Sequence, residues 1–321
     1  KAMDDRFQDF TPNPEVLGLV PDRAGNDING LGEAVPRRPT PIMWHDPSII
    51  AHGGIQKWFS QQGNSHGGIK SFGSDGSGPI PLADIAPERP NWSEKECTSL
   101  VKEAALARDA DLVGITRLDQ NWVFEGFEAD YQWMVVLAVA MDYEKLSTAP
   151  GDLSQDEVKK QYNRGTVAAY KLANWIREQG WDAKPHGGPQ SGPVLMIPGA
   201  ISAGLGELGK HGSMINRQLG SSFRLANVLT NMPLNPDTPD TFGADEFCMS
   251  CQLCTNTCPV DAITAAKQTV RGAEKWYVDF DKCILFFVEH NGCAMCLPAC
   301  PWSRPGVAPR LADKMSRRAN G

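Results

Sequence analysis

Apolar residues recur with a helical period in two segments near the middle of the chain. The first segment begins at Ser93-x-x-Glu96, the pattern of a capping box, and continues with apolar residues three and four positions apart. The second covers residues 155–179, and Gly180 follows it, where a left-handed C-cap is expected. We therefore predict two amphipathic helices, one short and one long.

Three other segments have the continuous apolar composition of buried strands. They cover residues 111–116, 133–141 and 224–232. Residues 182–200 are rich in glycine and proline, so we predict a loop between the long helix and the third strand. Because helices alternate with strands, we predict an α+β fold with α/β-like character.

The first 92 residues are rich in glycine and proline and predict an irregular segment that wraps around the rest. His-Gly-Gly-Ile occurs twice in it, at His52–Ile55 and His66–Ile69. Glycine lets a backbone approach a flat ligand closely, but the same sequence also suits a surface turn, and both interpretations stay open. We divide the chain into residues 1–92, 93–240 and 241–321.

Composition narrows the classes of function. Hydrophobic residues make up 41% of the chain and charged residues 21%, as in ordinary globular proteins. The net charge of −7 argues against a nucleic-acid ligand, because such binders usually present a basic face.

Cysteines supply the strongest signal, since eight of the nine lie between residues 248 and 300. The two runs read Cys248-x2-Cys251-x2-Cys254-x3-Cys258-Pro259 and Cys283-x9-Cys293-x2-Cys296-x3-Cys300-Pro301. The first run has the spacing of a bacterial [4Fe–4S] ferredoxin, in which the fourth cysteine of each run ligates the other cluster. We therefore assign Cys248, Cys251, Cys254 and Cys300 to a first cluster, and Cys258, Cys283, Cys293 and Cys296 to a second.

Two rival interpretations of the cysteines are weaker. A zinc ribbon would use paired Cys-x2-Cys motifs but would not explain two Cys-x3-Cys-Pro endings. A disulfide framework is typical of short secreted chains. Cys97 lies outside both runs, and we expect it to be a buried core thiol.

A glycine-rich motif, Gly204-Leu-Gly206-Glu-Leu-Gly209, has the literal form of a dinucleotide fingerprint. Such a site needs a strand directly before the motif and an acidic residue about 20 positions later. No acidic residue occurs between Glu207 and Asp237, so a nicotinamide site is disfavoured. A loop close to another cofactor remains open.

The segments 203–212 and 224–234, followed by the two cysteine runs, resemble the catalytic subunit of corrinoid reductive dehalogenases over about residues 155–303. The resemblance implies a nitroreductase-like, cobalamin-binding domain followed by a ferredoxin-like module with two [4Fe–4S] clusters. The activity it implies is replacement of a carbon–halogen bond by a carbon–hydrogen bond, with a Co(I) corrinoid as cofactor. Epoxyqueuosine reductase, a related corrinoid and iron–sulfur enzyme, is the alternative, and a dicluster electron carrier without catalysis is the competing class.

The resemblance also implies site residues. Tyr162 matches the proton donor, with Tyr170 in reserve, while Arg224 and Lys210 match cations that would stabilise the tyrosinate. The residues expected at the corrinoid are Gly204, Gly206, Glu207, Gly209, His211, Gly212 and Leu225. None of the six histidines lies in Asp-x-His-x-x-Gly, which suits base-off binding without a protein ligand to cobalt. Gly187-Gly188 replaces a polar asparagine of some relatives, which leaves the substrate undefined.

Partners follow from the same resemblance. We expect an organohalide substrate and a separate electron donor, reached through a small membrane-anchor subunit on the outer face of the cytoplasmic membrane after Tat export. A cytoplasmic ferredoxin or flavodoxin is the alternative donor, and a homodimer is kept open.

Overall fold

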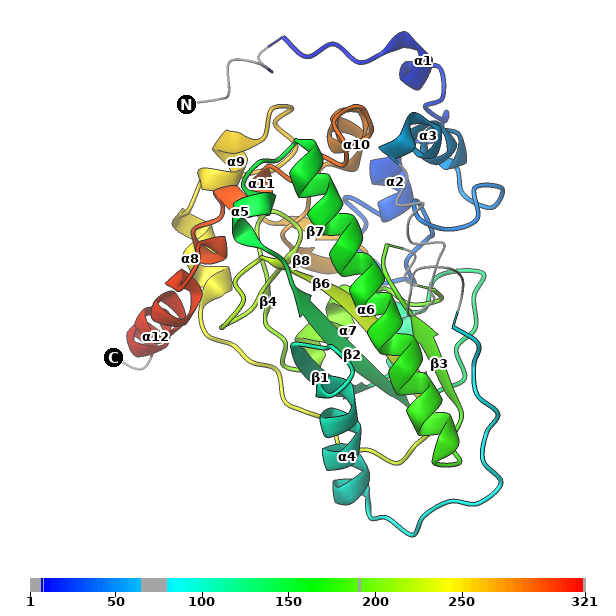
Figure 1. Cartoon of the computed structure of the whole chain (residues 1–321). Coiled ribbons are helices and arrows are strands. Elements are labelled where there is room, and N and C mark those ends of the chain that lie inside the picture. The colour runs from blue at the N-terminus through cyan, green and yellow to red at the C-terminus, as the bar shows by residue number, and fades with distance from the viewer. Residues whose placement is uncertain (1–6, 8, 65–79, 190–191, 320–321) are drawn as a thin grey trace.

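Figure 1 shows the computed structural model of the chain, which describes residues 7, 9–64, 80–189 and 192–319. Its centre is a four-stranded antiparallel sheet in the order β1-β2-β6-β3. The strands are β1 (Leu112–Arg117), β2 (Trp133–Ala140), β6 (Phe223–Thr230) and β3 (Ala183–His186). The mixed α/β class predicted from the sequence is confirmed.

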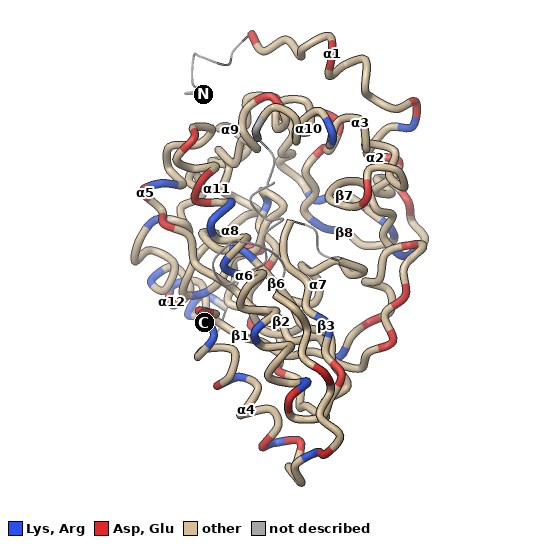
Figure 2. Tube along the Cα trace, turned by 45° about the vertical axis from the view of Figure 1, so that its right-hand side comes forward, with Lys and Arg blue, Asp and Glu red and all other residues tan. Residues whose placement is uncertain are grey.

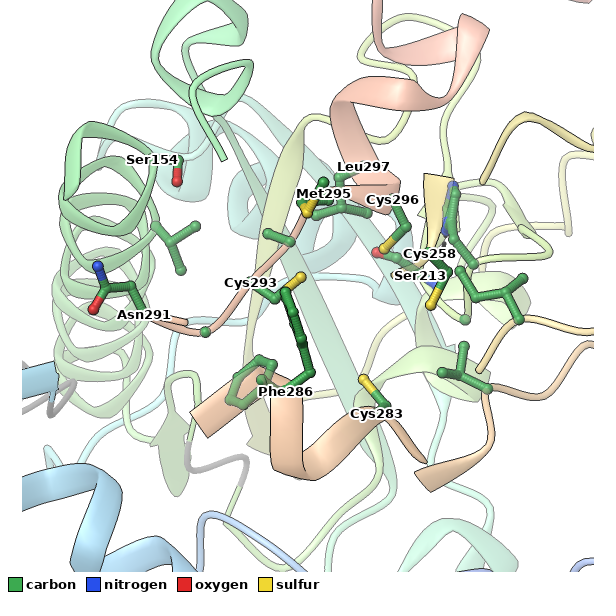
Figure 3. Close-up of a pocket in the computed structure, with 18 of the residues that line it drawn as sticks. Ser154, Ser213, Cys258, Cys283, Phe286, Asn291, Cys293, Met295, Cys296 and Leu297 are labelled. Atoms are coloured by element: carbon green, nitrogen blue, oxygen red, sulfur yellow. Dashed lines mark hydrogen bonds between the residues drawn. The ribbon is translucent and has the colours of Figure 1, made fainter. Parts of the chain in front are cut away.

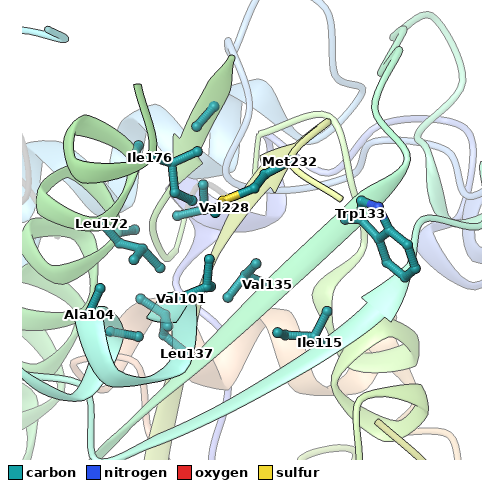
Figure 4. Close-up of a cluster of buried hydrophobic side chains, with 14 of the residues drawn as sticks. Val101, Ala104, Ile115, Trp133, Val135, Leu137, Leu172, Ile176, Val228 and Met232 are labelled. Atoms are coloured by element: carbon teal, nitrogen blue, oxygen red, sulfur yellow. The ribbon is translucent and has the colours of Figure 1, made fainter. Parts of the chain in front are cut away.

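Helices pack on both faces of this sheet, and the side chains of β2 point alternately to one face and the other. Trp133, Val135 and Leu137 are buried against α4 (Glu94–Leu106) and α6 (Asp152–Glu178). Figure 4 shows this core between the two helices and the strands. The intervening residues Met134, Val136 and Ala138 belong to the opposite core, which α7 (Met196–Ser202) covers. Burial on both faces explains why β2 is apolar at every position.

The predicted helix signals are confirmed. Ser93 and Glu96 form a reciprocal capping box at the start of α4, and Cys97 is fully buried. Helix α6 begins three residues before the predicted position, and Gly180 follows it with φ of 91°. A left-handed residue at that place satisfies the last carbonyl groups of the helix.

The predicted loop at 182–200 is wrong in part, because it contains β3 and α7. Strand β3 lies at the edge of the sheet, where Pro185 can be accommodated without loss of a ladder bond. Helix α7 is short and carries Pro198 and Gly199, which mimic the composition of a turn.

The N-terminal segment contains α1 (Pro14–Leu17), α2 (Gly25–Asn29) and α3 (Gly53–Phe59), followed by a π-helical turn over Ser60–Asn64. It packs against the C-terminal module, since the backbone N–H groups of Gly25 and Asn26 donate to Asp281 at 2.6 and 3.0 Å.

The first His-Gly-Gly-Ile copy is neither a ligand loop nor a surface turn, because it begins α3 and is largely buried. A Cβ on Gly53 would lie 1.9 Å from the carbonyl oxygen of Pro47, so a close backbone contact requires this glycine. The second copy lies outside the described residues.

The C-terminal module is built from short elements around the cysteine loops (Figure 1). They are α8 (Ala244–Ser250), α9 (Leu253–Thr257), β7 (Gln268–Val270), β8 (Ala273–Lys275), α10 (Phe280–Glu289), α11 (Cys296–Ala299) and α12 (Val307–Ala319). Two further strands, β4 (Glu207–Leu208) and β5 (Met214–Ile215), pair in the segment between α7 and β6. Among the described helices, none is both long and apolar enough to cross a bilayer.

Packing of α6 on the sheet should dominate the stability of this domain. Leu172 is fully buried between α6 and the strands, so we expect Leu172→Ala to lower the free energy of unfolding by about 2–5 kcal/mol. Denaturant unfolding followed by circular dichroism measures the loss. Lys171→Ala, at the exposed neighbouring position, should stay within about 0.5 kcal/mol of the parent. Equal effects of the two substitutions would contradict this account of the core.

Candidate active site

A cavity of about 280 Å³ lies where α6, β6 and the C-terminal module meet. Tyr162 of α6 and Arg224 of β6 line one part of it. The cysteines that line another part are Cys258, Cys283, Cys293 and Cys296. In Figure 3 the sulfur atoms of these four cysteines point toward the same space. The cavity therefore connects four thiols with a phenol and a cation.

The structure separates the eight thiols of the two runs into two groups, and none of them is in a disulfide. Burial raises the pKa of the Cys300 thiol to about 12, and the thiols of Cys248, Cys254 and Cys251 act in the same direction. Cys300 also shares a buried core with Cys248. The last cysteine of the second run thus lies with the first three cysteines of the first run.

The remaining four thiols form the group at the cavity. Burial raises the pKa of the Cys283 thiol to about 12, and the thiols of Cys293 and Cys258 act in the same direction. Burial likewise raises the pKa of the Cys296 thiol, whose neighbours include Cys254 of the other group. The two groups therefore adjoin each other, and bound metal would supply the positive charge that makes such buried thiols ionise.

Within the part of the chain that the structure describes, no three or more His, Cys, Asp or Glu side chains converge closely enough for a single metal ion.

The loop that carries Cys293 has an unusual backbone. Asn291, Gly292, Cys293 and Ala294 have φ of 52°, 79°, 46° and 66°. Such values are costly for residues other than glycine and cluster at functional sites. The tight loop holds Cys293 toward the cavity (Figure 3).

Tyr162 and Arg224 lie side by side at the opposite wall. The guanidinium carbon of Arg224 is 5.1 Å from the centroid of the Tyr162 ring. Gly188 leaves room for that ring, since a Cβ there would lie 2.4 Å from two of its carbons. The Nε atom of Arg224 is buried and has no hydrogen-bond partner among the described residues, which is unusual for a native protein.

A second cavity, of about 190 Å³, adjoins the first. Tyr162, Ser213 and Arg224 line both cavities, and Leu225 lines the second. The phenol and the guanidinium can therefore act on a ligand that occupies either space.

The ring of His211, which lines the first cavity, is held by hydrogen bonds at both nitrogens. Nδ1 accepts from the backbone N–H of Ser213 at 3.1 Å. Nε2 lies 2.9 Å from the hydroxyl of Ser221, which itself donates to the carbonyl of Met214, so Nε2 is the donor to Ser221. Burial lowers the pKa of His211 to about 4, and the imidazole is therefore neutral.

The glycine-rich loop divides into a packing half and a cavity half. A Cβ on Gly204 would lie 2.5 Å from the Thr238 carbonyl oxygen, and one on Gly206 would lie 2.0 Å from that of Ile215. Glu207 accepts from the backbone N–H of Ala244 at 2.6 Å. A Cβ on Gly209 would meet the His211 ring at 2.6 Å. Of the predicted cofactor residues in this loop, His211 and Gly212 line the cavity, and the others contact protein.

The structure separates the two predicted cations and the two predicted tyrosines. Lys210 is buried, and its Nζ donates to the Cys251 carbonyl at 2.8 Å, so it lies at the first thiol group and not beside Tyr162. Tyr170 lines neither cavity, and burial raises its pKa. Arg224 and Tyr162 are thus the pair that the fold brings together.

Trp44 is one of the cavity residues that sequence reasoning missed. Trp44 comes from the N-terminal segment, adopts a left-handed φ of 63°, and packs its ring edge-on against Phe59 and Phe287. No motif surrounds it, so only a tertiary structure could have placed it there.

Comparisons with known proteins show which families this chain is similar to. Residues 247–303 match the family described as a 4Fe–4S dicluster domain. A tetrachloroethene reductive dehalogenase of Dehalobacter restrictus is 29% identical over 289 residues, covering 70% of this chain and 52% of that protein. The chain thus spans about half the length of this curated relative.

Two other similarities are informative. The solved structure of the catabolic reductive dehalogenase NpRdhA matches with a TM-score of 0.68 and 25% identity, covering 84% of this chain and 40% of that one. An epoxyqueuosine reductase of Synechocystis sp. is 26% identical over 230 residues, covering 59% of this chain and 75% of that protein. The chain is therefore similar in sequence to two related groups of oxidoreductases, and its fold is that of a reductive dehalogenase.

The neutral state of His211 has a measurable consequence. The unfolded chain binds a proton at this residue below about pH 6.5, whereas the folded chain does so only near 4, so stability should fall as the pH decreases through this window. Between about pH 7.5 and about pH 5.5 this histidine should account for about 1 kcal/mol of lost stability.

The test compares His211→Gln with the parent by denaturant unfolding at both pH values. The comparison uses variant protein whose iron content equals that of the parent. The variant should lose about 1 kcal/mol of the pH dependence, while His186, whose pKa burial lowers to about 3, retains its own share. An unchanged pH dependence would show that His211 is not buried in its neutral form.

Proposed function

We propose that this chain is a corrinoid-dependent reductive dehalogenase. The reaction converts an organohalide, two electrons and one proton into the carbon–hydrogen product and a halide ion. The observation that carries the proposal is a single cavity bordered by Tyr162 and Arg224 on one wall and by four cysteine thiols on another. Similarity to tetrachloroethene reductive dehalogenases supports the same chemistry.

The chemistry of the thiols fits two [4Fe–4S] clusters. Each group supplies four cysteines, and the grouping of Cys300 with the first run follows the crossed ligation of two-cluster ferredoxins. The group at the cavity would hold the cluster that delivers electrons to the site. The other group, which adjoins it through Cys254 and Cys296, would receive electrons from a separate donor protein.

The lining of the two adjoining cavities supports a corrinoid bound without a protein ligand to cobalt. The described residues that line them include one histidine, His211, and both of its ring nitrogens are engaged. This arrangement supports base-off binding, with His211, Gly212 and Leu225 as cofactor contacts. When bound, the corrinoid in its Co(I) state would supply the electron pair that reduces the carbon–halogen bond.

Tyr162 is the proposed proton donor. A phenol holds its proton at neutral pH and gives it up when something stabilises the anion. The Arg224 cation, 5.1 Å from the ring centroid, would do so, and its effect grows as water is excluded from the cavity. The apolar side chains of Trp44, Val158 and Phe287 supply that exclusion.

The epoxyqueuosine reductase alternative would require recognition of an RNA. RNA binding usually requires a basic face. The net charge is −7, and Figure 2 shows Lys and Arg interspersed with Asp and Glu along much of the trace. These observations favour a small organohalide over an RNA substrate.

Metal analysis tests the cluster assignment. Eight cysteine ligands in two groups predict about eight iron and about eight sulfide per chain after reconstitution. Replacing Cys300 by serine should alter the electron paramagnetic resonance signal of the cluster bound to Cys248, Cys251 and Cys254. The matched variant Cys296→Ser should alter the other signal instead. About four iron per chain, or stoichiometric zinc, would refute two clusters.

Tyr162→Phe tests the proton donor, because it keeps the ring and deletes the acid. Loss of a positioned general acid typically lowers the rate by about 10²–10⁴-fold, so organohalide turnover should fall by that order while cobalt and iron content stay unchanged. Tyr170→Phe on the same helix is the matched control and should stay within about threefold. Full activity in Tyr162→Phe would assign the proton to another group. A reconstituted protein without cobalt would overturn the dehalogenase proposal itself.

A further inference from the structure

Lys210 is a buried cation that the proposed reaction does not use. Its side chain is 1% exposed, its Nζ donates to the Cys251 carbonyl at 2.8 Å, and the same atom lies 4.8 Å from the centroid of the Trp276 ring. Its backbone N–H hydrogen bonds to the Cys248 thiol. The main chain of Lys210 therefore contacts a thiol of the first group, and its side chain contacts the backbone of a cysteine in that group.

The second thiol group has the opposite electrostatic environment. The charged groups acting on Cys283 are the thiols of Cys293 and Cys258 and the carboxylate of Asp279, all of which disfavour added negative charge. Asp279 lies at the N-cap of α10, with 22% of its side chain exposed. Its nearest cation, Lys282, is 4.0 Å away and 55% exposed, so solvent screens that charge. The cation that lines the same cavity, Arg224, lies over the Tyr162 ring, 5.1 Å from its centroid.

We propose that Lys210 and Asp279 set the order in which the two clusters are reduced. This inference rests on the two clusters of the proposed function. Reduction adds one electron, and hence one negative charge, to a cluster, so a neighbouring cation raises its reduction potential and a neighbouring anion lowers it. The cluster of the first group is reduced first, and the cluster of the second group is the stronger reductant.

This order has a functional meaning because the second group lines the cavity. The cluster with the lower reduction potential would lie next to the cavity. The first cluster, at a higher potential, would hold an electron until the second cluster accepts it. The electrons come from the external donor, and each cluster accepts one of them at a time. Lys210 is thus a residue that tunes electron delivery and does not touch the substrate.

The experiment is a potentiometric titration of the reconstituted protein, followed by electron paramagnetic resonance. Lys210→Met removes the charge and keeps the length of the side chain. The equilibrium constant for reducing the first cluster should fall at least about tenfold, which is a shift of about 59 mV for a one-electron couple. The second cluster should change by less than about threefold. The signal altered in Cys300→Ser identifies the first cluster.

Two matched variants control for charge and for structure. Lys210→Arg keeps the cation and should restore the potential to within about threefold in the equilibrium constant. Lys267 also lies over the Trp276 ring, at 5.6 Å, but pairs with Asp245 at 2.6 Å. Lys267→Met should therefore leave the first cluster within about threefold of the parent.

Asp279→Asn provides a second, independent measurement, because asparagine also caps helices well. It should raise the equilibrium constant for reducing the second cluster by about threefold or more, without changing the first. An unchanged first cluster in Lys210→Met with full iron content would overturn the proposal. If Lys210→Met loses iron, an unchanged second cluster in Asp279→Asn would overturn it. A protein with both clusters but no cobalt would refute the proposed dehalogenase activity. The measured potentials would still test whether Lys210 and Asp279 set the order of reduction.

Discussion

Eight thiols, four of them buried and four partly buried, are the constraint on which the C-terminal half depends. Burial raises the pKa of the Cys248, Cys283 and Cys300 thiols to about 12, so an apolar protein interior alone would keep them protonated. Thiolates are stable at such sites only when metal compensates their charge. The helices and strands around them are short, so bound clusters, together with the wrapping N-terminal segment, would help to hold the module together.

The glycine-rich loop, which precedes β6 in the chain, packs against this module. Its first glycines allow backbone contacts that no larger residue could make, as the 2.0 Å separation of a Gly206 Cβ from the Ile215 carbonyl shows. That packing orients two consecutive side chains toward different sites. Lys210 reaches the Cys251 carbonyl, and His211 lines the cavity at the other thiol group. A single loop thereby positions the Lys210 side chain at the first cysteine group and the His211 side chain at the second.

Helix caps, buried strands and the cysteine ligand motifs could be predicted from the sequence. The capping box at Ser93, the apolar strand β2 and the spacing of the cysteine runs each express a pattern within a few residues. Cysteine spacing and the family resemblance also indicated the grouping of Cys300 with the first run and the pairing of Tyr162 with Arg224. Other contacts between distant segments could not be predicted, because no local pattern specifies them. Trp44 reaches the cavity from the far end of the chain, and Lys210 turns away from Tyr162 toward Cys251. A family resemblance assigned both Lys210 and Arg224 as cations, but only tertiary packing distinguishes their surroundings.

The choice of a phenol as proposed acid fits the electrostatics of the cavity. A carboxylic acid placed beside clusters of thiolates would add a second negative charge to a region already rich in them, and burial would oppose its ionisation further. A tyrosine is neutral at rest and becomes charged only after it has given up its proton. Arg224 is then the cation that meets the tyrosinate, and its buried Nε, which lacks a partner among the described residues, retains capacity for a further acceptor. The halide ion released in the proposed reaction is such an acceptor, so the same guanidinium can stabilise both anions that the reaction leaves behind.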